Sequence, residues 1–250
     1  QLQANEEGVE GSADPEFVHQ ARVALRRMRS ALRLFRDAIG PRRSRAWRDA
    51  LAAFASRLGG ARDWDVFALE TLPPALAEHG ELVLGRELSA RAERRRLRER
   101  AAARRTLASR GYARTVLAIA RWLAFAGDAS DPREARARVA PFAARVLRKR
   151  HRRLLDHARH VARLTPEERH RVRIEAKRLR YAVDALASLF PSRATRRYRD
   201  TLEELQDVLG AANDAASASR LIGEIDPPPA FLHAARRQFA AKAAGDAARL

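Results

Sequence analysis

Apolar residues recur at helical spacing along most of the chain. A helix turns by about 100° per residue, so residues three and four positions apart share one face. In the segment 15–39 one such face carries Ala21, Leu25, Met28, Leu32, Phe35 and Ile39. No alternating run rich in Val, Ile and Thr predicts a strand. The pattern therefore predicts an all-α fold.

Capping residues and helix breakers divide this pattern into ten elements. Asp14-Pro15 and Thr165-Pro166 each place a capping residue before a proline at the first helical position. Glycine and proline pairs, such as Gly59-Gly60 and Pro73-Pro74, predict breaks. The predicted helices cover residues 15–39, 44–58, 63–78, 81–108, 112–126, 134–164, 166–190, 193–208, 213–225 and 230–248.

The second half of the chain repeats the first at an offset of 151 residues, without a gap. Over residues 14–63, sixteen of fifty positions are identical to their mates. We expect one domain over residues 1–250, with half-repeats of about 1–127 and 130–250 joined by a linker at 127–132. The two halves are expected to form pseudo-symmetric helical bundles. Because the chain does not begin with Met, it is predicted to be part of a longer protein.

A basic stripe runs beside the apolar face of one helix in each half. The first stripe holds His19, Arg22, Arg26, Arg29 and Arg33, and its mate holds His170, Arg173, Lys177 and Arg180. Like charges three or four positions apart destabilise a helix by about 0.2–0.5 kcal/mol per pair, and an ordinary exposed helix would interleave glutamates. No acidic residue lies between His19 and Arg36. We therefore predict an anion site in which the two stripes face each other and line one groove or pore.

Two other basic helices are weaker candidates for the anion site. The helix 81–108 contains its own acidic partners, such as Glu87 for Arg91, and is read as solvated surface. The helix 134–164 could add a wall to the site, and its candidates are Arg145, Arg148, Lys149, Arg152 and Arg153. Asp63 and Asp214 each follow a glycine at an expected helix start, which favours capping or pairing with a neighbouring arginine.

Charge, cysteine content and the length of the apolar runs exclude some classes of function and favour others. The chain of 250 residues has 50 Lys and Arg against 31 Asp and Glu, a net charge of +19 that favours a polyanionic partner. It has no cysteine, which excludes disulfides, thiolate zinc sites and thiol nucleophiles. No apolar run is long enough for a membrane span and no secretory signal is visible, so no membrane partner and a cytoplasmic location are expected.

No cofactor motif or metal-ligand set is visible in the sequence. It has no P-loop, no glycine-rich dinucleotide turn and no His-Glu-x-x-His motif. An enzyme acting on phosphoanhydrides would need carboxylates for metal ions near the stripes, and the stripes contain none. We therefore predict no catalytic residues, no cofactor and no metal site.

Four segments resemble signatures of the CHAD family, the conserved-histidine α-helical domain. VHQARVALRRMRSALRLF and HRVRIEAKRLRYAVDALASLF are similar to its two main signatures, and LGGARDWDVF and LGAANDAASA to its Leu-Gly…Asp segments. The resemblance extends from about Glu10 to Ile225. It implies two pseudo-symmetric helical bundles around a basic groove or pore that binds inorganic polyphosphate, association with polyphosphate granules, and frequent fusion to a CYTH triphosphatase domain.

The matched signature positions imply a set of polyphosphate-binding residues. They are His19, Arg22, Arg26, Arg27 and Arg29 in the first half, and His170, Arg173, Lys177, Arg178, Arg180 and Tyr181 in the second. Arg33 joins them because it continues the first stripe. The prediction is a non-catalytic polyphosphate-binding domain with weaker affinity for other polyanions.

Two alternatives stay open at this point: a nucleic-acid-binding protein, and an accessory domain of a phosphoanhydride-cleaving enzyme. Nucleic-acid-binding modules usually add aromatic platforms or base-reading side chains, which the stripes do not contain. Arginine forks suit bidentate contacts to phosphate. These two considerations favour polyphosphate.

Overall fold

The computed structural model describes residues 1–79, 81–125, 132–159 and 165–247. Within these ranges the chain is helical and contains no strand, so the predicted all-α class is confirmed. The expected linker at 127–132 falls largely outside the described residues. The α-helices are α1 (Glu6–Gly11), α2 (Pro15–Leu34), α3 (Arg36–Ile39), α4 (Pro41–Val66), α5 (Leu72–His79), α6 (Leu82–Leu107), α7 (Arg110–Phe125), α8 (Pro132–Ala158), α9 (Pro166–Leu186), α10 (Ser192–Val208), α11 (Ala211–Gly223) and α12 (Pro229–Ala247).

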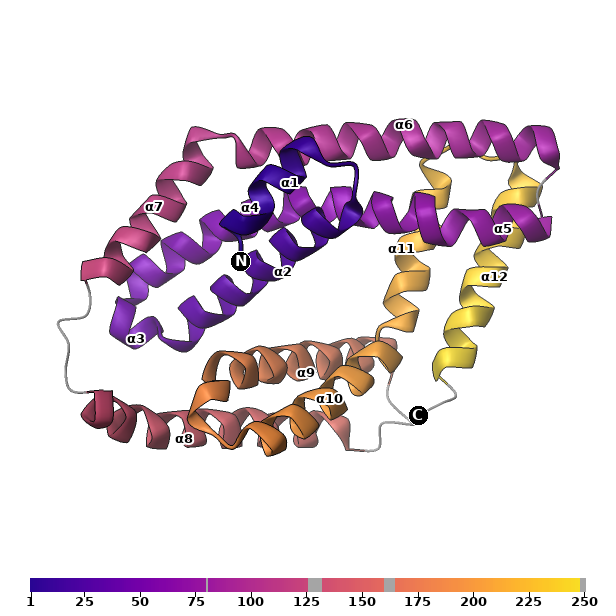
Figure 1. The fold of residues 1–250 in the computed structure, drawn as a ribbon. Helices are drawn as coiled ribbons and strands as arrows, with labels where there is room; N and C mark the ends of the chain where they lie inside the picture. Colours follow the sequence, from indigo (N-terminus) through magenta and orange to yellow (C-terminus); the bar gives the residue numbers. More distant parts are fainter. Residues whose placement is uncertain (80, 126–131, 160–164, 248–250) are drawn as a thin grey trace.

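The helices form two layers that α11 and α12 connect. Figure 1 shows α1 to α7 in the upper layer, with α6 along its outer edge, and α8, α9 and α10 in the lower layer. The helices α11 and α12 rise from the lower layer to α5 and α6. The helix α2 lies on the inner side of the upper layer and contacts α9 of the lower layer. None of the helices in the described part of the chain has the length and apolar character needed to cross a bilayer.

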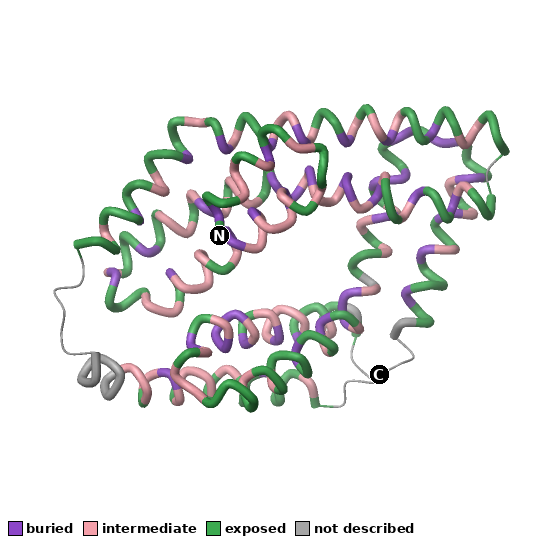
Figure 2. Tube along the Cα trace, in the orientation of Figure 1, coloured by how far each residue is buried: buried purple, intermediate pink, exposed green. Residues whose placement is uncertain are grey.

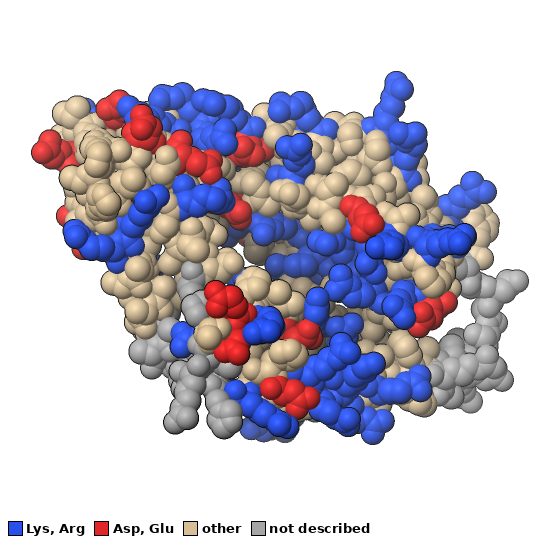
Figure 3. Space-filling model, turned by 180° about the vertical axis from the view of Figure 1, so that it is seen from behind, with Lys and Arg blue, Asp and Glu red and all other residues tan. Residues whose placement is uncertain are grey.

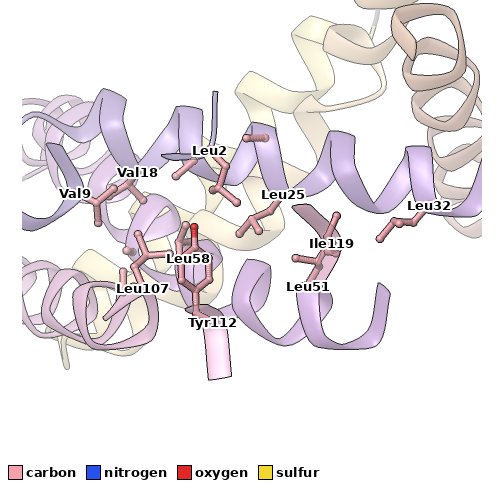
Figure 4. Close-up of a cluster of buried hydrophobic side chains, with 14 of the residues drawn as sticks. Leu2, Val9, Val18, Leu25, Leu32, Leu51, Leu58, Leu107, Tyr112 and Ile119 are labelled. Atoms are coloured by element: carbon pink, nitrogen blue, oxygen red, sulfur yellow. The ribbon is translucent and has the colours of Figure 1, made fainter. Parts of the chain in front are cut away.

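Many buried positions lie on the inner faces of the helices (Figure 2). Their hydrophobic side chains form three clusters. The first joins α1, α2, α3, α4, α6 and α7 around residues such as Leu25 and Leu58, which are fully buried (Figure 4). Ala21, Leu25, Leu32 and Ile39 of the predicted apolar face are buried, and Met28 and Phe35 pack against them. The apolar face of the first repeat helix is therefore confirmed.

The second cluster combines the two predicted halves of the chain. Trp64, Phe67 and Leu88 of the first half pack there against Ile222 and Phe239 of the second. The third cluster holds α8, α9 and α10 together. Because α11 and α12 pack onto α5 and α6, the helices of each expected half-repeat do not pack only within their own half.

Several predicted helix boundaries are wrong. The expected break at Gly59-Gly60 does not occur, because α4 runs through both residues to Val66. A glycine inside a helix costs only about 1 kcal/mol, and a Cβ at Gly60 would lie 2.9 Å from Glu99 Oε2. The helix then continues through a π-helical turn at Phe67–Thr71 into α5, where Pro73 and Pro74 occupy the first turn. The short helix α1 was not predicted.

The two repeat helices begin in the same way. Asp14 caps α2 by accepting a hydrogen bond from the Glu16 backbone N–H at 2.8 Å. Thr165 and Glu168 form the expected capping box at the start of α9. Each cap satisfies backbone donors that the first turn leaves free. These caps fix where the two basic stripes begin.

Candidate anion-binding site

The basic stripes of α2 and α9 line one cavity of about 760 Å³. The hydrophobic faces of the two helices point into their own clusters, so the stripes beside those faces turn toward each other. Figure 3 shows Lys and Arg side chains gathered around a hollow on the back of the molecule. The predicted residues in the lining are His19, Arg22, Arg26, Arg27, Arg173, Lys177, Arg180 and Tyr181.

A smaller cavity of about 180 Å³ continues the same surface. It shares Arg26, Lys177 and Tyr181 with the larger cavity. Three further predicted residues, Arg29, Arg33 and Arg178, line it together with Arg48 and Arg150, which were not predicted. The two cavities therefore meet at the Arg26, Lys177 and Tyr181 side chains and form one basic track.

Tyr181 organises this junction. Its ring lies under two guanidinium groups, with Arg26 Cζ 5.0 Å and Arg180 Cζ 5.6 Å from the ring centroid. Such cation–π contacts contribute about 0.5–1 kcal/mol at exposed sites and about 2 kcal/mol where water is excluded. The residue is only 6% exposed, and its buried hydroxyl has no hydrogen-bond partner. Tyr181 lines both cavities, and the hydrogen-bonding capacity of its hydroxyl is unused.

Most cations of the track have no carboxylate partner among the described residues. Within the described part of the chain, no ion pair within 4.0 Å forms at Arg26, Arg29, Arg173 or Lys177. The Nε atoms of Arg26, Arg29, Arg173 and Arg180 are buried and make no hydrogen bond. A buried polar group without a partner costs about 1–3 kcal/mol, and more when it is charged. An anion beside these cations would offset the cost of burying their charge.

Other cations of the stripes are held by acidic side chains. Arg22 Nη1 donates to Asp63 Oδ1 at 3.0 Å and to the Gly59 carbonyl at 3.3 Å. Arg180 Nη1 donates to Glu203 Oε1 at 2.7 Å. The pairing of Asp63 with an arginine is as expected, but Asp63 does not cap a helix because it lies inside α4. These carboxylates fix the direction of their arginines.

Carboxylates are also present in the cavity wall, contrary to what the stripes alone indicate. Asp63, Glu70, Glu203, Asp207 and Asp214 line the larger cavity from α4, α10, α11 and the π-helical turn. These carboxylates lie on helices other than the two that carry the stripes, so the periodicity of the stripe helices alone does not reveal them. In the described residues, no group of three His, Asp or Glu side chains is placed to hold a metal ion.

Burial and the crowding of positive charge lower the pKa of three basic groups in the site. Burial, together with the charges of Arg173 and Arg26, lowers the pKa of Lys177 to about 8. Burial also lowers the pKa of Arg26. At His19, burial and the charge of Arg62 lower the pKa below its ordinary value, so the imidazole is neutral at pH 7. A bound anion would favour the charged form of each group.

Some predicted residues lie elsewhere. His170 is exposed and is absent from the lining of both cavities, so the structure does not place it opposite His19. Among the α8 side chains that the structure describes, Arg150 alone lines the track, whereas the five candidates at 145–153 are exposed. Arg48 could have been found, because Arg199 occupies its mate position in the repeat. Nothing in the sequence singles out Arg150 from its basic neighbours.

The lowered pKa of Lys177 predicts a pH dependence of anion binding. Because the free protein loses the Lys177 proton above about pH 8, affinity is expected to fall as the pH rises through 8, by up to about tenfold per pH unit. Near pH 8 binding should take up protons, which titration calorimetry in buffers of different ionisation enthalpy would measure. The variant Lys177→Arg keeps its charge over this pH range, so its affinity should not fall near pH 8 and its binding should take up no protons. If the affinity of this variant depends on pH as that of the wild type does, Lys177 is not the group that causes the dependence.

Comparisons with known proteins agree with this architecture. A family model described as the CHAD domain matches residues 1–223. The crystal structure of the CHAD domain from the plant Ricinus communis is similar, with 33% identity and a TM-score of 0.79, over 98% of this chain and 82% of that one. PptA from Streptomyces chartreusis shares the fold at 18% identity, with a TM-score of 0.65 over 99% and 93% of the two chains. A search of curated proteins finds no match.

Proposed function

This chain belongs to the CHAD domain family, and on that basis we propose that it binds inorganic polyphosphate in the track between α2 and α9 without cleaving it. The observation that carries the proposal is the convergence of unpaired, partly buried cations from both stripes on one cavity. We also propose that this binding places the protein on polyphosphate granules in the cytoplasm.

The chemistry of the track suits a flexible chain of phosphates. Each phosphate presents several acceptor oxygens, and arginine forks bind such groups bidentately. The track extends along α2 from His19 to Arg33, about 21 Å at 1.5 Å per residue. A linear polyanion can therefore contact cations from both helices along its length.

The aromatic residues of the track argue against single-stranded nucleic acid. Modules that bind such strands stack bases on free aromatic faces. Here the ring of Tyr181 is covered by Arg26 and Arg180, and Phe67, the other aromatic residue in the lining, is 1% exposed. Neither ring offers a platform to a base.

Two of the five carboxylates in the cavity wall support binding rather than catalysis. Asp63 and Glu203 are already engaged by Arg22 and Arg180. Phosphoryl-transfer sites use their carboxylates to hold metal ions and to position the nucleophile. In this cavity the paired carboxylates orient guanidinium groups toward the ligand instead.

A competition titration tests the proposed function. Labelled long-chain polyphosphate is displaced by duplex DNA, single-stranded RNA, ATP or pyrophosphate at one fixed salt concentration, because such affinities depend steeply on salt. We expect nucleic acids to compete orders of magnitude more weakly per phosphate than unlabelled polyphosphate. Equal competition per phosphate would mean that the +19 chain is a general polyanion binder and would overturn the proposal.

A further inference from the structure

Lysine is rare in this chain, and one of its lysines lies in the anion cavity. Only three of the 50 Lys and Arg side chains are lysines, namely Lys149, Lys177 and Lys242. Lys149 and Lys242 are exposed, whereas Lys177 is half-buried and lines both cavities. Arginine stays charged in proteins, but a lysine that gives up its proton becomes a nucleophilic amine. Lys177 therefore brings to the track a chemistry that its arginines do not have.

The surroundings of Lys177 favour this neutral, nucleophilic form. Arg173 lies one turn earlier on α9, and Arg22 and Arg26 lie across the cavity on α2. Asp214 of α11 is the acidic group that acts on Lys177, but it does not come within ion-pair distance in the described part of the chain. Burial and the cations lower the pKa of Lys177 to about 8, so half of its amines are neutral at that pH. A lysine of ordinary pKa is neutral there to less than about 1%.

The same surroundings suit an electrophile that carries a phosphate group. Arg26 and Arg173 line the cavity with Lys177, and neither has a carboxylate partner among the described residues. Guanidinium groups bind phosphate oxygens and stabilise the negative charge of a phosphate leaving group. In an acyl phosphate one oxygen joins the phosphorus to the electrophilic carbonyl carbon, so a phosphate bound by these arginines brings that carbon to the neighbouring amine. The thioester carbonyl of acetyl coenzyme A lies far from its phosphates and lacks this match.

We propose that Lys177 is an acylation site for small acyl phosphates, whose phosphate group binds to Arg26 and Arg173 while the Lys177 amine attacks the carbonyl carbon. A carbon–nitrogen bond forms, and the bond between the carbonyl carbon and the phosphate oxygen breaks. The amine gives one proton to the leaving phosphate. The products are an Nε-acyl lysine and inorganic phosphate, and nothing is oxidised or reduced.

Acylation of Lys177 would weaken polyphosphate binding, a consequence that rests on the proposed function. The amide carries no charge, and it would stand where the two cavities meet. Conversely, bound polyphosphate covers the amine and favours its charged form, which does not react. Acylation and polyphosphate binding therefore oppose each other, so that an empty track is modified and an occupied track is protected.

The three lysines allow the first test to be made within one protein. The full chain is incubated at about pH 8 with acetyl phosphate, or with N-acetoxysuccinimide as an uncharged acetyl donor. Peptide mass spectrometry after cleavage at acidic residues measures the acetylation of each lysine. We expect acetyl phosphate to modify Lys177 at least about tenfold faster than Lys149 or Lys242, because the larger neutral fraction outweighs the weaker nucleophilicity of a less basic amine. Equal rates at the three lysines would overturn the inference.

A cavity variant tests whether the arginines deliver the acyl phosphate. Arg26→Gln with Arg173→Gln leaves Lys177 in place, and the control is Arg94→Gln with Arg98→Gln on the exposed face of α6. Circular dichroism checks that both variants fold. The rate with acetyl phosphate, divided by the rate with N-acetoxysuccinimide, should fall at least about fivefold in the cavity variant, because only the charged donor binds to the arginines. The control should keep the wild-type ratio. An unchanged ratio in the cavity variant would show that the arginines do not hold the phosphate group, and the inference would be wrong.

Long-chain polyphosphate separates this inference from the proposed function. A saturating amount should slow the acetylation of Lys177 by at least about tenfold relative to Lys242, since a bound anion raises the pKa of the amine. If Lys177 reacts fast but polyphosphate does not slow it, and the acetylated protein binds polyphosphate as before, the acylation site stands and the proposed function is wrong. If polyphosphate protects Lys177 from N-acetoxysuccinimide but acetyl phosphate modifies Lys177 no faster than Lys242, the cavity site stands and the acylation inference is wrong.

Discussion

Replacing Arg26 and Lys177 together with glutamate is expected to lower the affinity for long-chain polyphosphate by at least about a hundredfold. Each contact between a cationic side chain and a phosphate contributes about 1.5–3 kcal/mol, and two lost contacts already correspond to this factor. Both residues lie where the two cavities meet, so the reversed charges also repel the ligand at the middle of the track. Fluorescence anisotropy with labelled polyphosphate would measure the loss.

The same variant should remain folded. Neither Arg26 nor Lys177 has a carboxylate partner among the described residues, so the change leaves no acidic group unpaired. The lowered pKa of Lys177 means that its charged form is disfavoured in the folded state, so below about pH 8 its removal does not cost stability through charge. The change also removes the cation–π contact between Arg26 and Tyr181, worth about 0.5–2 kcal/mol, so thermal unfolding is expected to show a melting temperature lower by at most about 2–8 °C.

A control with the same change in net charge is Arg94→Glu with Arg98→Glu on the exposed face of α6. We expect it to weaken binding by less than about threefold, through long-range electrostatics alone. If the control loses as much affinity as the cavity variant, the site is not where the two stripes meet. If the cavity variant keeps the wild-type affinity, polyphosphate likewise does not bind where the two stripes meet.

The substitution Asp65→Asn is expected to lower the free energy of unfolding by about 3–5 kcal/mol. Asp65 of α4 is fully buried and accepts hydrogen bonds from Arg96 and Arg100 of α6 at 3.1 Å each. Removing one partner of a buried charge network leaves the other charges without compensation. Arg100 also donates to the carbonyls of Ser12 and Asp14, at 2.8 Å and 3.2 Å, so this network anchors the segment that starts α2.

Urea unfolding monitored by circular dichroism measures this effect. The control is Asp37→Asn, because Asp37 pairs with Arg36 at 3.1 Å but its side chain is 82% exposed. Exposed pairs contribute about 0–1 kcal/mol, so the control should change stability by less than about 1 kcal/mol. A similarly small change for Asp65→Asn would show that the buried network does not hold α4, α6 and the start of α2 together.

The basic stripes could be predicted from the sequence because they depend on local periodicity. The apolar face of α2 fixes its rotation against α4, and the positions of Arg22, Arg26 and Arg29 follow from the helical repeat. The ungapped repeat then pointed to Arg173 and Lys177 on α9. The two stripes line one cavity because α2 and α9 each bury the apolar face that lies beside the stripe.

What could not be predicted depends on contacts between distant segments. Gly59 and Gly60 indicate a break locally, but packing of α4 against α2 and α6 keeps the helix intact. The partners of Asp65 lie on α6, some thirty residues away, so the charge run of that helix looked like solvated surface although Arg96 and Arg100 are buried. His170 repeats His19 in sequence, yet it is exposed outside the cavity lining, because repeat position alone does not determine what surrounds a side chain.

The most direct test of the central claim is a crystal structure of the protein with bound polyphosphate. The account predicts phosphate density in the larger cavity, within hydrogen-bond distance of Arg26, Arg173, Lys177 and the Tyr181 hydroxyl, which are the cations and the buried donor that lack partners in the described structure. Density confined to the outer surfaces of α6 or α10, with the cavity side chains unchanged, would contradict it.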